Sequence, residues 1–499
     1  MKLFLTLLFA VLCGFTYSQS WIIDWQNSLG GTSDDKAQSI EQTLDGGYIV
    51  AGNSWSVDGD VNGNNGSNDY WVVKQDASGS IQWEKTLGGS GNDYAQAIQQ
   101  TDDLGFIVVG ASNSNDGDVS VNYGGNDFWV VKLDGLGNIL WEKSLGGTND
   151  EQAYSVTQTI DGGYVIAGYS NSNDGDVSGN NGLSDYWIVK LDPSGNLLWQ
   201  DSYGGSLMDY GTSVKSTDDG GVVVAGYSRS SDGDLLSVGN AGLYDYWILK
   251  LDVSGNILWE RSTGGSDNDY AQSIKQTVDG GYIVAGASAS CCASTSHIGG
   301  MDYWIVKLNS SGVVSWERSL GGSEDDYAFS VTETSDGGYA VAGTTFSSSF
   351  DVTTNNGFSD YWVVKLDGTG NIDWKKSLGG SDFDVANDIK QTSDGAYVIA
   401  GYTSSNDMDV TGNNGDDDYW VVKLTLGCEN FTGTDTRTEC APFTWIDGID
   451  YTQNNNTATH NIIGGAANGC DSLVTLNLTI VSPNVTSNLW NISPNMDVS

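Results

Sequence analysis

Histidine, proline and basic residues are scarce in this chain. Its 499 residues include 2 histidines, 4 prolines and 20 lysines and arginines, against 64 aspartates and glutamates, and the formal net charge is -44. His297 and His460 lie far apart in the sequence, which excludes a metal centre of several histidines and gives a Ser–His–Asp triad little support. Phosphate backbones and anionic membrane surfaces would repel such a chain, so we expect no nucleic-acid partner and no membrane insertion.

Long apolar runs are missing apart from the N-terminus. The run from Leu3 to Phe15 follows Lys2 and precedes the small residues Thr16 and Ser18, which is the pattern of a secretory signal peptide over residues 1–18. We therefore expect the protein to be secreted or attached to the cell surface. No other stretch approaches the ~18 apolar residues that a membrane-spanning helix needs.

Cysteine is also rare, with 6 in the chain, and export would allow disulfides. Cys13 would leave with the signal peptide. The neighbours Cys291 and Cys292 would form a vicinal disulfide or stay free, and we prefer an ordinary pair of Cys440 with Cys470. Cys428 would then be left over, although it could compete for either partner.

Tryptophan and glycine, in contrast, are abundant and regularly placed. The 18 tryptophans include two series with one and the same spacing of 57 to 60 residues. The first series is Trp25, Trp83, Trp141, Trp199, Trp259, Trp316 and Trp374, and the second is Trp71, Trp129, Trp187, Trp247, Trp304, Trp362 and Trp420. Chance does not produce this agreement, so the sequence predicts a unit of about 58 residues that occurs seven times.

Each unit divides into four predicted strands. Examples are residues 271–277 (AQSIKQT), 282–286 (YIVAG), 360–367 (DYWVVKLD) and 138–144 (NILWEKS). The first and second strands are joined by TxDGGY and the third and fourth by DxSGN, both typical of tight hairpins. Four antiparallel strands repeated seven times indicate an all-β fold, a seven-bladed β-propeller.

The ends of the array predict how the ring closes. The first recognisable element, residues 21–31, is a fourth-strand motif, and the last, residues 418–426, is a third-strand motif. Pairing residues 21–28 with residues 418–426 completes the last blade and removes two exposed edges. We therefore place the propeller at 19–427, a small β-rich, sandwich-like module at 428–482 and a tail at 483–499.

Two residue series within the strands have structural interpretations. We expect the tryptophans to pack between neighbouring blades. A lysine also recurs in the third strand, at Lys74, Lys132, Lys190, Lys250, Lys307, Lys365 and Lys423. It shares a face with Tyr rather than Trp, and we expect it to extend along apolar surface or to pair with a cross-strand Glu84, Glu142, Glu260 or Glu317.

Acidic residues gather in two kinds of connection that should lie on one face of a propeller. An acid precedes every first strand: Asp35, Asp93, Glu151, Asp209, Asp269, Asp326 and Asp384. Another precedes each Tyr/Phe-Trp: Asp69, Asp127, Asp185, Asp245, Asp302, Asp360 and Asp418. The long second-to-third connections carry a D-x-D motif at Asp58/Asp60, Asp116/Asp118, Asp174/Asp176, Asp232/Asp234 and Asp407/Asp409.

The D-x-D loops are our candidate metal sites. Ca²⁺ prefers six to eight oxygen ligands, and N-D-G-D-V-x-G-N-N-G supplies Asp, Asn and backbone oxygens around sharp glycine turns. The motif is not an EF-hand, because the third Asp and the Glu at position 12 are missing. The alternative is that Asp and Asn only cap their own backbone. The fifth unit has CCASTSHIGG in this loop and the sixth retains only Asp351, so any metal role is limited to some blades.

Two regions carry family resemblances. The run VVKLDxSGNILWEKS, seen at Leu133 to Trp141, resembles the tryptophan-docking motif of quinoprotein-like propellers, and the whole unit resembles repeats of large secreted bacterial propellers. This implies the fold, but we cannot match the quinone pocket of the dehydrogenases. Residues 428–480 resemble a small β-rich module of type IX secretion cargo. Such cargo ends in a sorting domain, of which residues 483–499 would be a truncated start or an unrelated tail.

The function that we expect is binding or adhesion. An acidic loop face on a secreted, monomeric propeller, with Ca²⁺ as its candidate cofactor, would recognise extracellular glycans or proteins. The alternative is a carbohydrate-active enzyme, a glycosidase or lyase, on the same scaffold. Acids that recur in every blade favour binding, because an active site should break the symmetry in one place. We identify no catalytic and no organic-cofactor residues.

Overall fold

The computed structural model describes residues 21–290, 299–427, 431–462 and 472–481. These residues form two compact units, one from Trp21 to Thr425 and one that begins at Leu426. The predicted signal peptide, the Cys291–Cys292 pair, Cys428, Cys470 and the tail lie outside the described residues.

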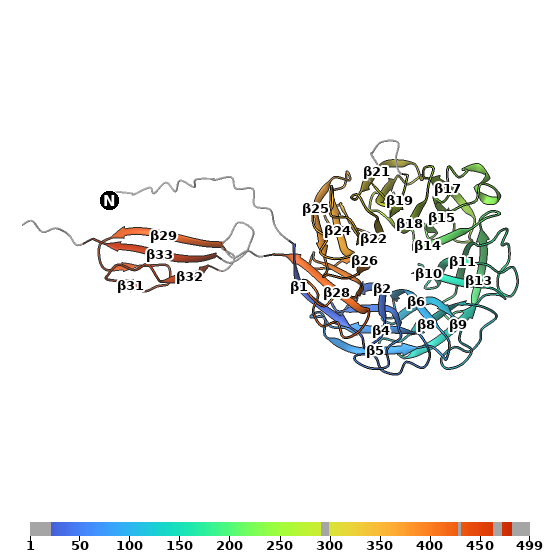
Figure 1. Cartoon of the computed structure of the whole chain (residues 1–499), viewed down its shortest axis with the longest axis horizontal. Coiled ribbons are helices and arrows are strands. Elements are labelled where there is room, and N and C mark those ends of the chain that lie inside the picture. The colour runs from blue at the N-terminus through green and yellow to red at the C-terminus, as the bar shows by residue number, and fades with distance from the viewer. Residues whose placement is uncertain (1–20, 291–298, 428–430, 463–471, 482–499) are drawn as a thin grey trace, which may run out of the picture. The chain divides into compact units, whose positions relative to one another are not determined.

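The first unit is a seven-bladed β-propeller, as the sequence predicts (Figure 1). Each blade is an antiparallel sheet of four strands, and the innermost strand faces a central opening. The inner strands are β2 (Asp35–Gln42), β6 (Asp93–Gln100), β10 (Glu151–Gln158), β14 (Asp209–Ser216), β18 (Asp269–Gln276), β22 (Asp326–Glu333) and β26 (Asp384–Gln391). The second strands are β3 (Tyr48–Ser54), β7 (Phe106–Ser112), β11 (Tyr164–Ser170), β15 (Val222–Ser228), β19 (Tyr282–Ser288), β23 (Tyr339–Thr345) and β27 (Tyr397–Thr403).

The remaining strands of each blade lie farther from the centre (Figure 1). The third strands are β4 (Asp69–Gln75), β8 (Asp127–Leu133), β12 (Asp185–Leu191), β16 (Asp245–Leu251), β20 (Asp302–Leu308), β24 (Asp360–Leu366) and β28 (Asp418–Leu426). The outer strands are β5 (Ile81–Leu87), β9 (Ile139–Leu145), β13 (Leu197–Tyr203), β17 (Ile257–Thr263), β21 (Val314–Leu320), β25 (Ile372–Leu378) and β1 (Trp21–Leu29).

The predicted closure of the ring is confirmed. The last blade has the strand order β1-β28-β27-β26, so the first strand of the described chain completes the sheet formed by the last three propeller strands. Side chains add to the pairing: Trp420 Nε1 donates to Gln26 Oε1 at 2.7 Å, and Ser28 Oγ donates to the carbonyl oxygen of Thr411 at 3.0 Å.

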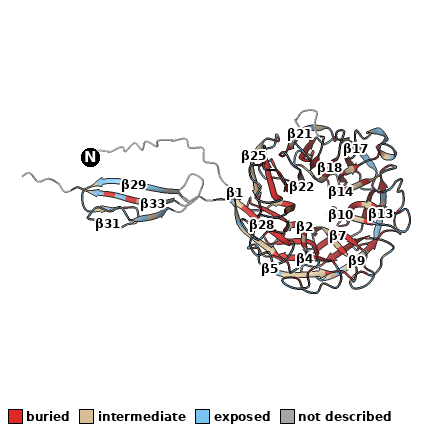
Figure 2. Cartoon of the chain, viewed as in Figure 1, coloured by how far each residue is buried: buried red, intermediate tan, exposed pale blue. Residues whose placement is uncertain are grey.

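The third-strand tryptophans form the seams between blades, which confirms their predicted packing. Trp187 is fully buried and its ring centre lies 4.5 Å from that of Phe128 in the preceding blade. Tyr186 continues the pattern, because its ring lies 4.7 Å from Trp247 and its hydroxyl donates to the Trp247 carbonyl at 2.9 Å. Figure 2 shows the buried residues concentrated in the second and third strands. Rigid aromatic pairs of this kind contribute large apolar area to a core.

The outer-strand tryptophans are half-buried and meet the turn of the next blade. At Gly195, in the turn before β13, φ is +79°, and a Cβ atom would lie 2.9 Å from the ring of Trp141. Only glycine combines this backbone conformation with so close an approach. The DxSGN turn therefore docks on the tryptophan of its neighbour, in keeping with the tryptophan-docking resemblance.

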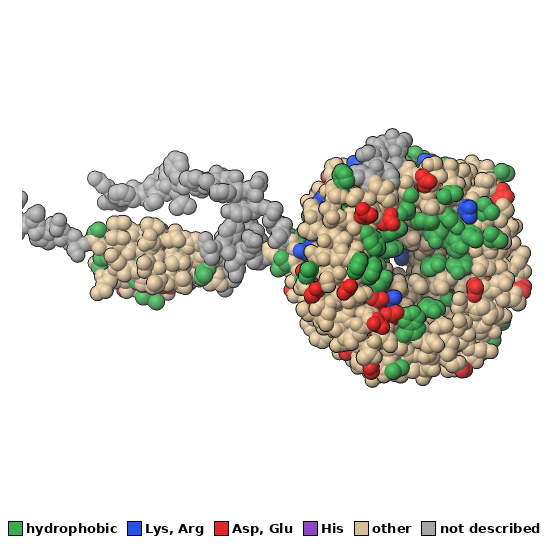
Figure 3. All heavy atoms as spheres, in the orientation of Figure 1, with side chains coloured by type: hydrophobic (Ala, Val, Ile, Leu, Met, Phe, Trp, Pro, Cys, Tyr) green, Lys and Arg blue, Asp and Glu red, His purple; other side chains and the backbone are tan. Residues whose placement is uncertain are grey.

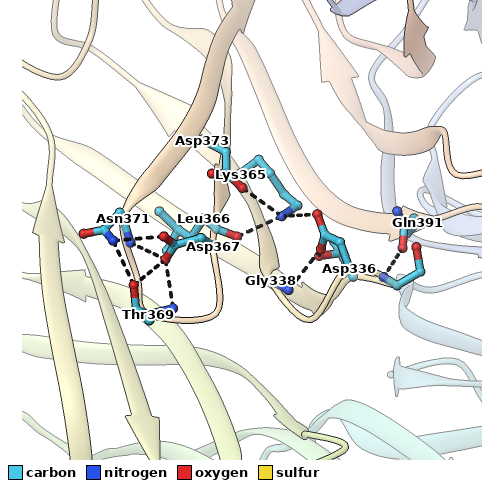
Figure 4. Close-up of polar contacts among 11 residues, drawn as sticks. Asp336, Gly338, Lys365, Leu366, Asp367, Thr369, Asn371, Asp373 and Gln391 are labelled. Atoms are coloured by element: carbon cyan, nitrogen blue, oxygen red, sulfur yellow. Dashed lines mark hydrogen bonds and ion pairs between the residues drawn. The ribbon is translucent and has the colours of Figure 1, made fainter. Parts of the chain in front are cut away.

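The third-strand lysines do form ion pairs, but the partner predicted from the sequence is wrong. Lys365 Nζ lies 2.9 Å from Asp336 in the TxDGGY hairpin and donates to the carbonyl oxygen of Leu366 at 2.9 Å (Figure 4). The same hairpin Asp pairs with the lysine in every blade, in Asp45, Asp103, Asp161, Asp219, Asp279, Asp336 and Asp394. The glutamates Glu84, Glu142 and Glu260 accept instead from the indole N–H of Trp71, Trp129 and Trp247.

These ion pairs help to lower the pKa of the hairpin aspartates. Burial alone would raise the pKa of Asp161, but hydrogen bonds from Lys190, Thr159 and the Gly163 N–H outweigh it and lower that pKa to about 2. The lysine stem is buried under the hairpin while the carboxylate stays more than half exposed. The strand register shows why the glutamate is not the partner. Glu84 lies opposite Val73 and so on the face of Trp71, whereas the residue opposite Lys74 is Trp83.

The second unit is a small β-rich module, as expected. Its strands are β29 (Phe431–Glu439), β30 (Phe443–Thr444), β31 (Asp450–Tyr451), β32 (Thr459–Ile462) and β33 (Ser472–Ile480). β33 lies between β29 and β32, and β30 pairs with β31. Its core is Trp445, Leu476 and Leu478, and Trp445 Nε1 donates to Asp435 at 3.0 Å.

Helix is almost absent from the described part of the chain. A single 3₁₀ turn, η1 (Gly233–Ser237), interrupts the strands there. None of the described residues forms a helix long and apolar enough to span a membrane.

Candidate functional site

The D-x-D aspartates lie on one face of the propeller, which we call the loop face. The first Asp of each motif accepts a hydrogen bond from the connection that leads into the inner strand of its own blade, as when Thr148 N–H donates to Asp174 Oδ1 at 2.8 Å. This contact confirms that the two kinds of connection share a face. Equivalent bonds hold Asp58, Asp116, Asp232 and Asp407.

The second Asp of each motif lies against the same connection. Asp234 Oδ2 accepts from the backbone N–H of Gly204 at 3.0 Å, and longer contacts of 3.3 to 3.4 Å hold Asp60, Asp118, Asp176 and Asp409. The ten aspartates thus tie two loops together within each blade. Among the described residues no group of three or more His, Cys, Asp or Glu is placed to hold a metal ion. Calcium binding by these loops stays a prediction that would need several backbone oxygens.

The other two acidic series meet in pairs below the loop face. A Cβ atom on Gly146 would lie 2.4 Å from both Asp127 Oδ1 and Glu151 Oε2, so one glycine separates two buried carboxyl groups. The same arrangement recurs at every seam, and we call these groups the seam carboxyl pairs. They are Asp418/Asp35, Asp69/Asp93, Asp127/Glu151, Asp185/Asp209, Asp245/Asp269, Asp302/Asp326 and Asp360/Asp384.

Burial changes the acidity of these pairs. Burial, together with the nearby charge of Glu151, raises the pKa of Asp127 to about 7. Asp185, Asp360 and Asp418 have pKa values of about 7, and Asp69 and Asp245 of about 6, with burial as the largest cause each time. Asp127 Oδ1 has no hydrogen-bond partner among the described residues. A proton shared within each pair relieves the repulsion.

The seven-fold pattern breaks on the loop face, next to the inner strands. Tyr169, Tyr210, Tyr227, Tyr244 and Tyr270, with Tyr154 below them, form one set of touching rings that we call the tyrosine cluster. Ring centres lie 4.8 Å apart between Tyr169 and Tyr210 and 4.9 Å apart between Tyr227 and Tyr270. All six rings are only partly buried. Figure 3 shows apolar and aromatic side chains gathered beside the central opening, over the region where Figure 1 labels β14, β15 and β18.

The cluster is confined to the third, fourth and fifth blades. Tyr210 is the second residue of its inner strand, a position that is also tyrosine in Tyr94, Tyr270 and Tyr327 but is Lys36, Gln152 or Val385 in the other three blades. Burial, with the neighbouring tyrosines, raises the pKa of Tyr169 to about 12, and the pKa of Tyr227 rises further in the same direction. The hydroxyl groups therefore stay protonated near neutral pH and can donate hydrogen bonds.

The inner strands of all seven blades line a central cavity of about 480 Å³, which we call the channel. The seventh residue of each inner strand faces it, and these residues are Glu41, Gln99, Thr157, Lys215, Lys275, Thr332 and Lys390. In the first two blades this residue forms what we call a latch, a side chain that accepts a backbone N–H of a neighbouring blade. Glu41 Oε2 accepts from Gln100 N–H at 2.6 Å, and Gln99 Oε1 accepts from Gln158 N–H at 2.7 Å. A lysine ammonium cannot accept, so three blades lack this latch.

The fifth inner-strand residue forms a second set of latches. It is Ser155, Ser213 or Ser273 in the middle blades, and each hydroxyl accepts a backbone N–H of the following blade at 3.1 to 3.2 Å. Asp388 takes this position in the last blade and accepts from Ile40 N–H at 3.0 Å, from Ser330 at 2.7 Å and from Lys390. It closes the seam between the last blade and the first.

A further latch explains the glutamine in the QTxDGGY motif. Gln391 Oε1 accepts from Ser335 N–H at 2.7 Å, which ties one hairpin to the next (Figure 4). The same bond recurs with Gln42, Gln100, Gln158, Gln276 and Glu333.

Neither the tyrosine cluster nor the group of channel-lining lysines was predicted from the sequence. The signal was available as repeat positions whose residue type changes between units, such as Glu, Gln, Thr, Lys, Lys, Thr, Lys at the seventh inner-strand position. The sequence does not show that these positions, which belong to different units, meet around the ring.

Comparisons with known proteins add little to this geometry. No protein-family model matches the chain. A curated relative, regulatory protein FlaEY of Caulobacter vibrioides, is 23% identical over 226 residues, which are 42% of this chain and 24% of that protein. The chain thus matches only about a quarter of the relative's length, so nothing of the relative's whole activity transfers.

Solved structures with a similar fold include an enzyme and a WD40 domain. The Pan2 WD40 domain of Neurospora crassa is 11% identical, with 81% of this chain and 96% of that chain covered and a TM-score of 0.46. A gluconolactonase of Xanthomonas campestris is 10% identical, with 66% and 86% covered and a TM-score of 0.35. The chain is a β-propeller by its own strand order, and the fold by itself does not choose between catalysis and binding.

Proposed function

We propose that this chain is a binding propeller of the cell surface or extracellular space that recognises a glycan through the tyrosine cluster on its loop face. The observation that carries the proposal is a partly exposed set of six touching tyrosines confined to three of the seven blades. A fold built on repetition needs no such cluster in three blades only, since the other four close their seams without it.

The chemistry of the cluster suits a sugar. Tyrosine faces offer apolar area for the C–H groups of a pyranose ring, and their hydroxyl groups offer hydrogen bonds to sugar hydroxyls. The charges around the cluster are mixed, because Asp150 lies near Tyr169 and Arg229 lies over the ring of Tyr244, 5.9 Å from its centre. Neither sign of charge dominates, so the ligand class that we propose is a neutral sugar chain.

Binding is favoured over glycoside hydrolysis. The seam carboxyl pairs recur at all seven seams, and each loop partner, such as Asp127, already accepts a backbone N–H. Three inner-strand acids have no acidic equivalent in the other blades, Glu41, Asp388 and Glu333, and each accepts a backbone N–H of a neighbouring blade. Neither arrangement leaves a free acid beside a free base, which the hydrolysis of a glycosidic bond requires.

The test compares two tyrosines at the same strand position. Tyr210 belongs to the cluster, whereas Tyr94 is the second residue of β6 in a blade outside it. The purified full chain is first screened on a glycan array, and the best ligand is titrated by calorimetry against wild type, Tyr210→Ala and Tyr94→Ala. We expect at least about a tenfold loss of affinity in Tyr210→Ala and an unchanged affinity in Tyr94→Ala.

Three results would contradict the proposal. One is equal loss in both variants, since Tyr94 has no part in the cluster. The second is unchanged glycan affinity in Tyr210→Ala with an unchanged melting temperature. The third is no binding on the array at all, which would leave a protein ligand as the remaining interpretation of the loop face.

A further inference from the structure

Three lysines, Lys215, Lys275 and Lys390, line the channel at one strand position, and we call them the channel lysines. The chain has only 20 basic residues in total, and seven of these are committed to the hairpin ion pairs. Three lysines around one cavity are unexpected in an acidic protein, because the positive charge of each raises the free energy of keeping the others charged.

The channel lysines differ in how far they are compensated. Lys390 pairs with Asp388, and Lys275 donates only to Thr332 Oγ1, at 3.3 Å. Lys215 makes no hydrogen bond or ion pair with any described residue. The three lysine side chains are only partly buried, so each can meet solvent in the channel, and their neighbouring positive charges attract a mobile counterion.

The carboxylates that face these lysines are already engaged. Glu41 from β2 accepts from Gln100 N–H, Asp388 from β26 accepts four hydrogen bonds, and Glu333 accepts from Val278 N–H at 3.0 Å. The remaining titratable residues of the channel lining are Tyr154 of β10 and Asp218, which follows β14 and is exposed. Among the described residues, none of these carboxylates forms an ion pair with Lys215, although Asp388 and Glu41 act on it from a distance.

The pKa shifts of two channel lysines agree with this lack of ion-pair partners. Burial, together with the positive charges of Lys390 and Lys275, lowers the pKa of Lys215 to about 8, against the opposite effect of Asp388 and Glu41. Burial likewise lowers the pKa of Lys275. Lys215 therefore still carries positive charge at neutral pH, in a cavity with hydroxyl and amide donors from Ser213, Thr157 and Gln99.

We infer that the channel binds a small oxyanion with two negative charges, such as sulfate, phosphate or a short dicarboxylate, between Lys215 and Lys275. The cavity of about 480 Å³ is large enough for such a molecule. The site is separate from the tyrosine cluster, since Tyr210 and Lys215 lie five residues apart on β14, about 17 Å at ~3.3 Å per residue. A negative result for glycan binding at the tyrosine cluster therefore does not contradict anion binding in the channel, and the reverse also holds.

The experiment is a calorimetric titration of the full chain with sulfate, phosphate and malonate at low ionic strength and pH 7. Each anion is tested on wild type, Lys215→Met, Lys275→Met and the double variant. The matched control is Lys143→Met, which makes the same change on the outer strand β9. We expect about a tenfold loss of affinity for each channel lysine removed and no loss in Lys143→Met.

A pH series with sulfate provides a readout that a purely structural lysine would not move. Sulfate keeps its charge from pH 6 to 10, so any change reports the protein. We expect wild-type affinity to fall as the pH rises through about 8, where Lys215 loses its proton. Lys215→Arg should retain binding at pH 9.5, because arginine stays protonated there.

Two outcomes would overturn the proposal. The first is that wild type binds none of the three anions more tightly than Lys215→Met does. The second is a pH response of Lys215→Arg identical to that of wild type. Melting temperatures of all variants identify any that fail to fold. If Lys215→Met fails to fold, the pH response of Lys215→Arg still tests the proposal.

Discussion

The seams between blades and the inner wall of the propeller follow opposite rules. At the seams the same contacts recur around the ring, in the aromatic pairs such as Phe128–Trp187 and in the seam carboxyl pairs. Along the channel and the tyrosine cluster, equivalent positions hold different residues, as with Glu41 and Lys215. Repetition identifies what every blade needs to pack against its neighbour, whereas departure from it identifies residues that packing does not require.

The largest effect should come from the pH dependence of the repeated seams. Seam carboxyls have folded pKa values of about 6 to 7 against 3.8 unfolded, so the stability they contribute is complete below 3.8 and is lost as the pH rises through 6 to 7. Hairpin aspartates such as Asp161, with a folded pKa of about 2, contribute above 3.8 and lose their contribution as the pH falls toward 2. We expect the melting temperature to be highest near pH 4.

The size of this effect follows from the number of pairs. At roughly 1 kcal/mol per pair after allowance for solvent screening, raising the pH from 4 to 8 should cost about 7 kcal/mol over the seven pairs. Thermal unfolding of wild type in matched ionic strength measures it. A chain that is more stable at pH 8 than at pH 4 would show that the pairs are not protonated in the folded state.

The next largest effect should follow from removing one seam tryptophan. Trp187→Ala deletes a fully buried ring that packs on Phe128, and such deletions cost about 3–5 kcal/mol. Denaturant unfolding measures the loss. The control is Trp141→Ala, a half-buried outer-strand tryptophan, which should cost clearly less; equal losses would mean that burial at the seam is not what holds the blades together.

A conservative change at one seam should stabilise the protein. Asp127→Asn keeps an oxygen for the Tyr123 N–H and removes the charge that faces Glu151. We expect a gain of about 1 kcal/mol at pH 8 and none at pH 4, where the carboxyl is already protonated. Paired melting curves at the two pH values test this, and destabilisation at pH 8 would contradict it.

The smallest expected effect is that of calcium on the D-x-D loops. Because both aspartates of each motif are used in hydrogen bonds, we expect millimolar Ca²⁺ to raise the melting temperature by only about 1–2 °C over a chelator control. Asp174→Asn should reduce the shift, and Mg²⁺ should not reproduce it. Identical curves with calcium and with chelator would remove the calcium prediction.

Much of the propeller could be predicted because its signals are local and periodic. The spacing of Trp71 to Trp129, which recurs along the chain, predicts the repeat unit. The fourth-strand motif at residues 21–29 and the third-strand motif at 418–426 predict how the ring closes. The partner of Lys365 was mispredicted because the register places Trp374 opposite this lysine and puts the residue after that Trp on the other face, so the ammonium pairs with Asp336 of the adjacent hairpin. The contact between Tyr169 and Tyr210 could not be predicted, since it depends on the approach of adjacent blades.

The completion of the last blade by β1 also has a consequence for the order of folding. Blades made of consecutive strands can form as soon as their own segment is available, but the sheet that holds β26 to β28 needs a strand from nearly 400 residues earlier in the chain. Such a distant pairing carries a large loop-closure cost and a slow search. The ring should therefore assemble as an open arc whose last step joins its two ends, and weakening β1 should slow closure while leaving the individual blades able to form.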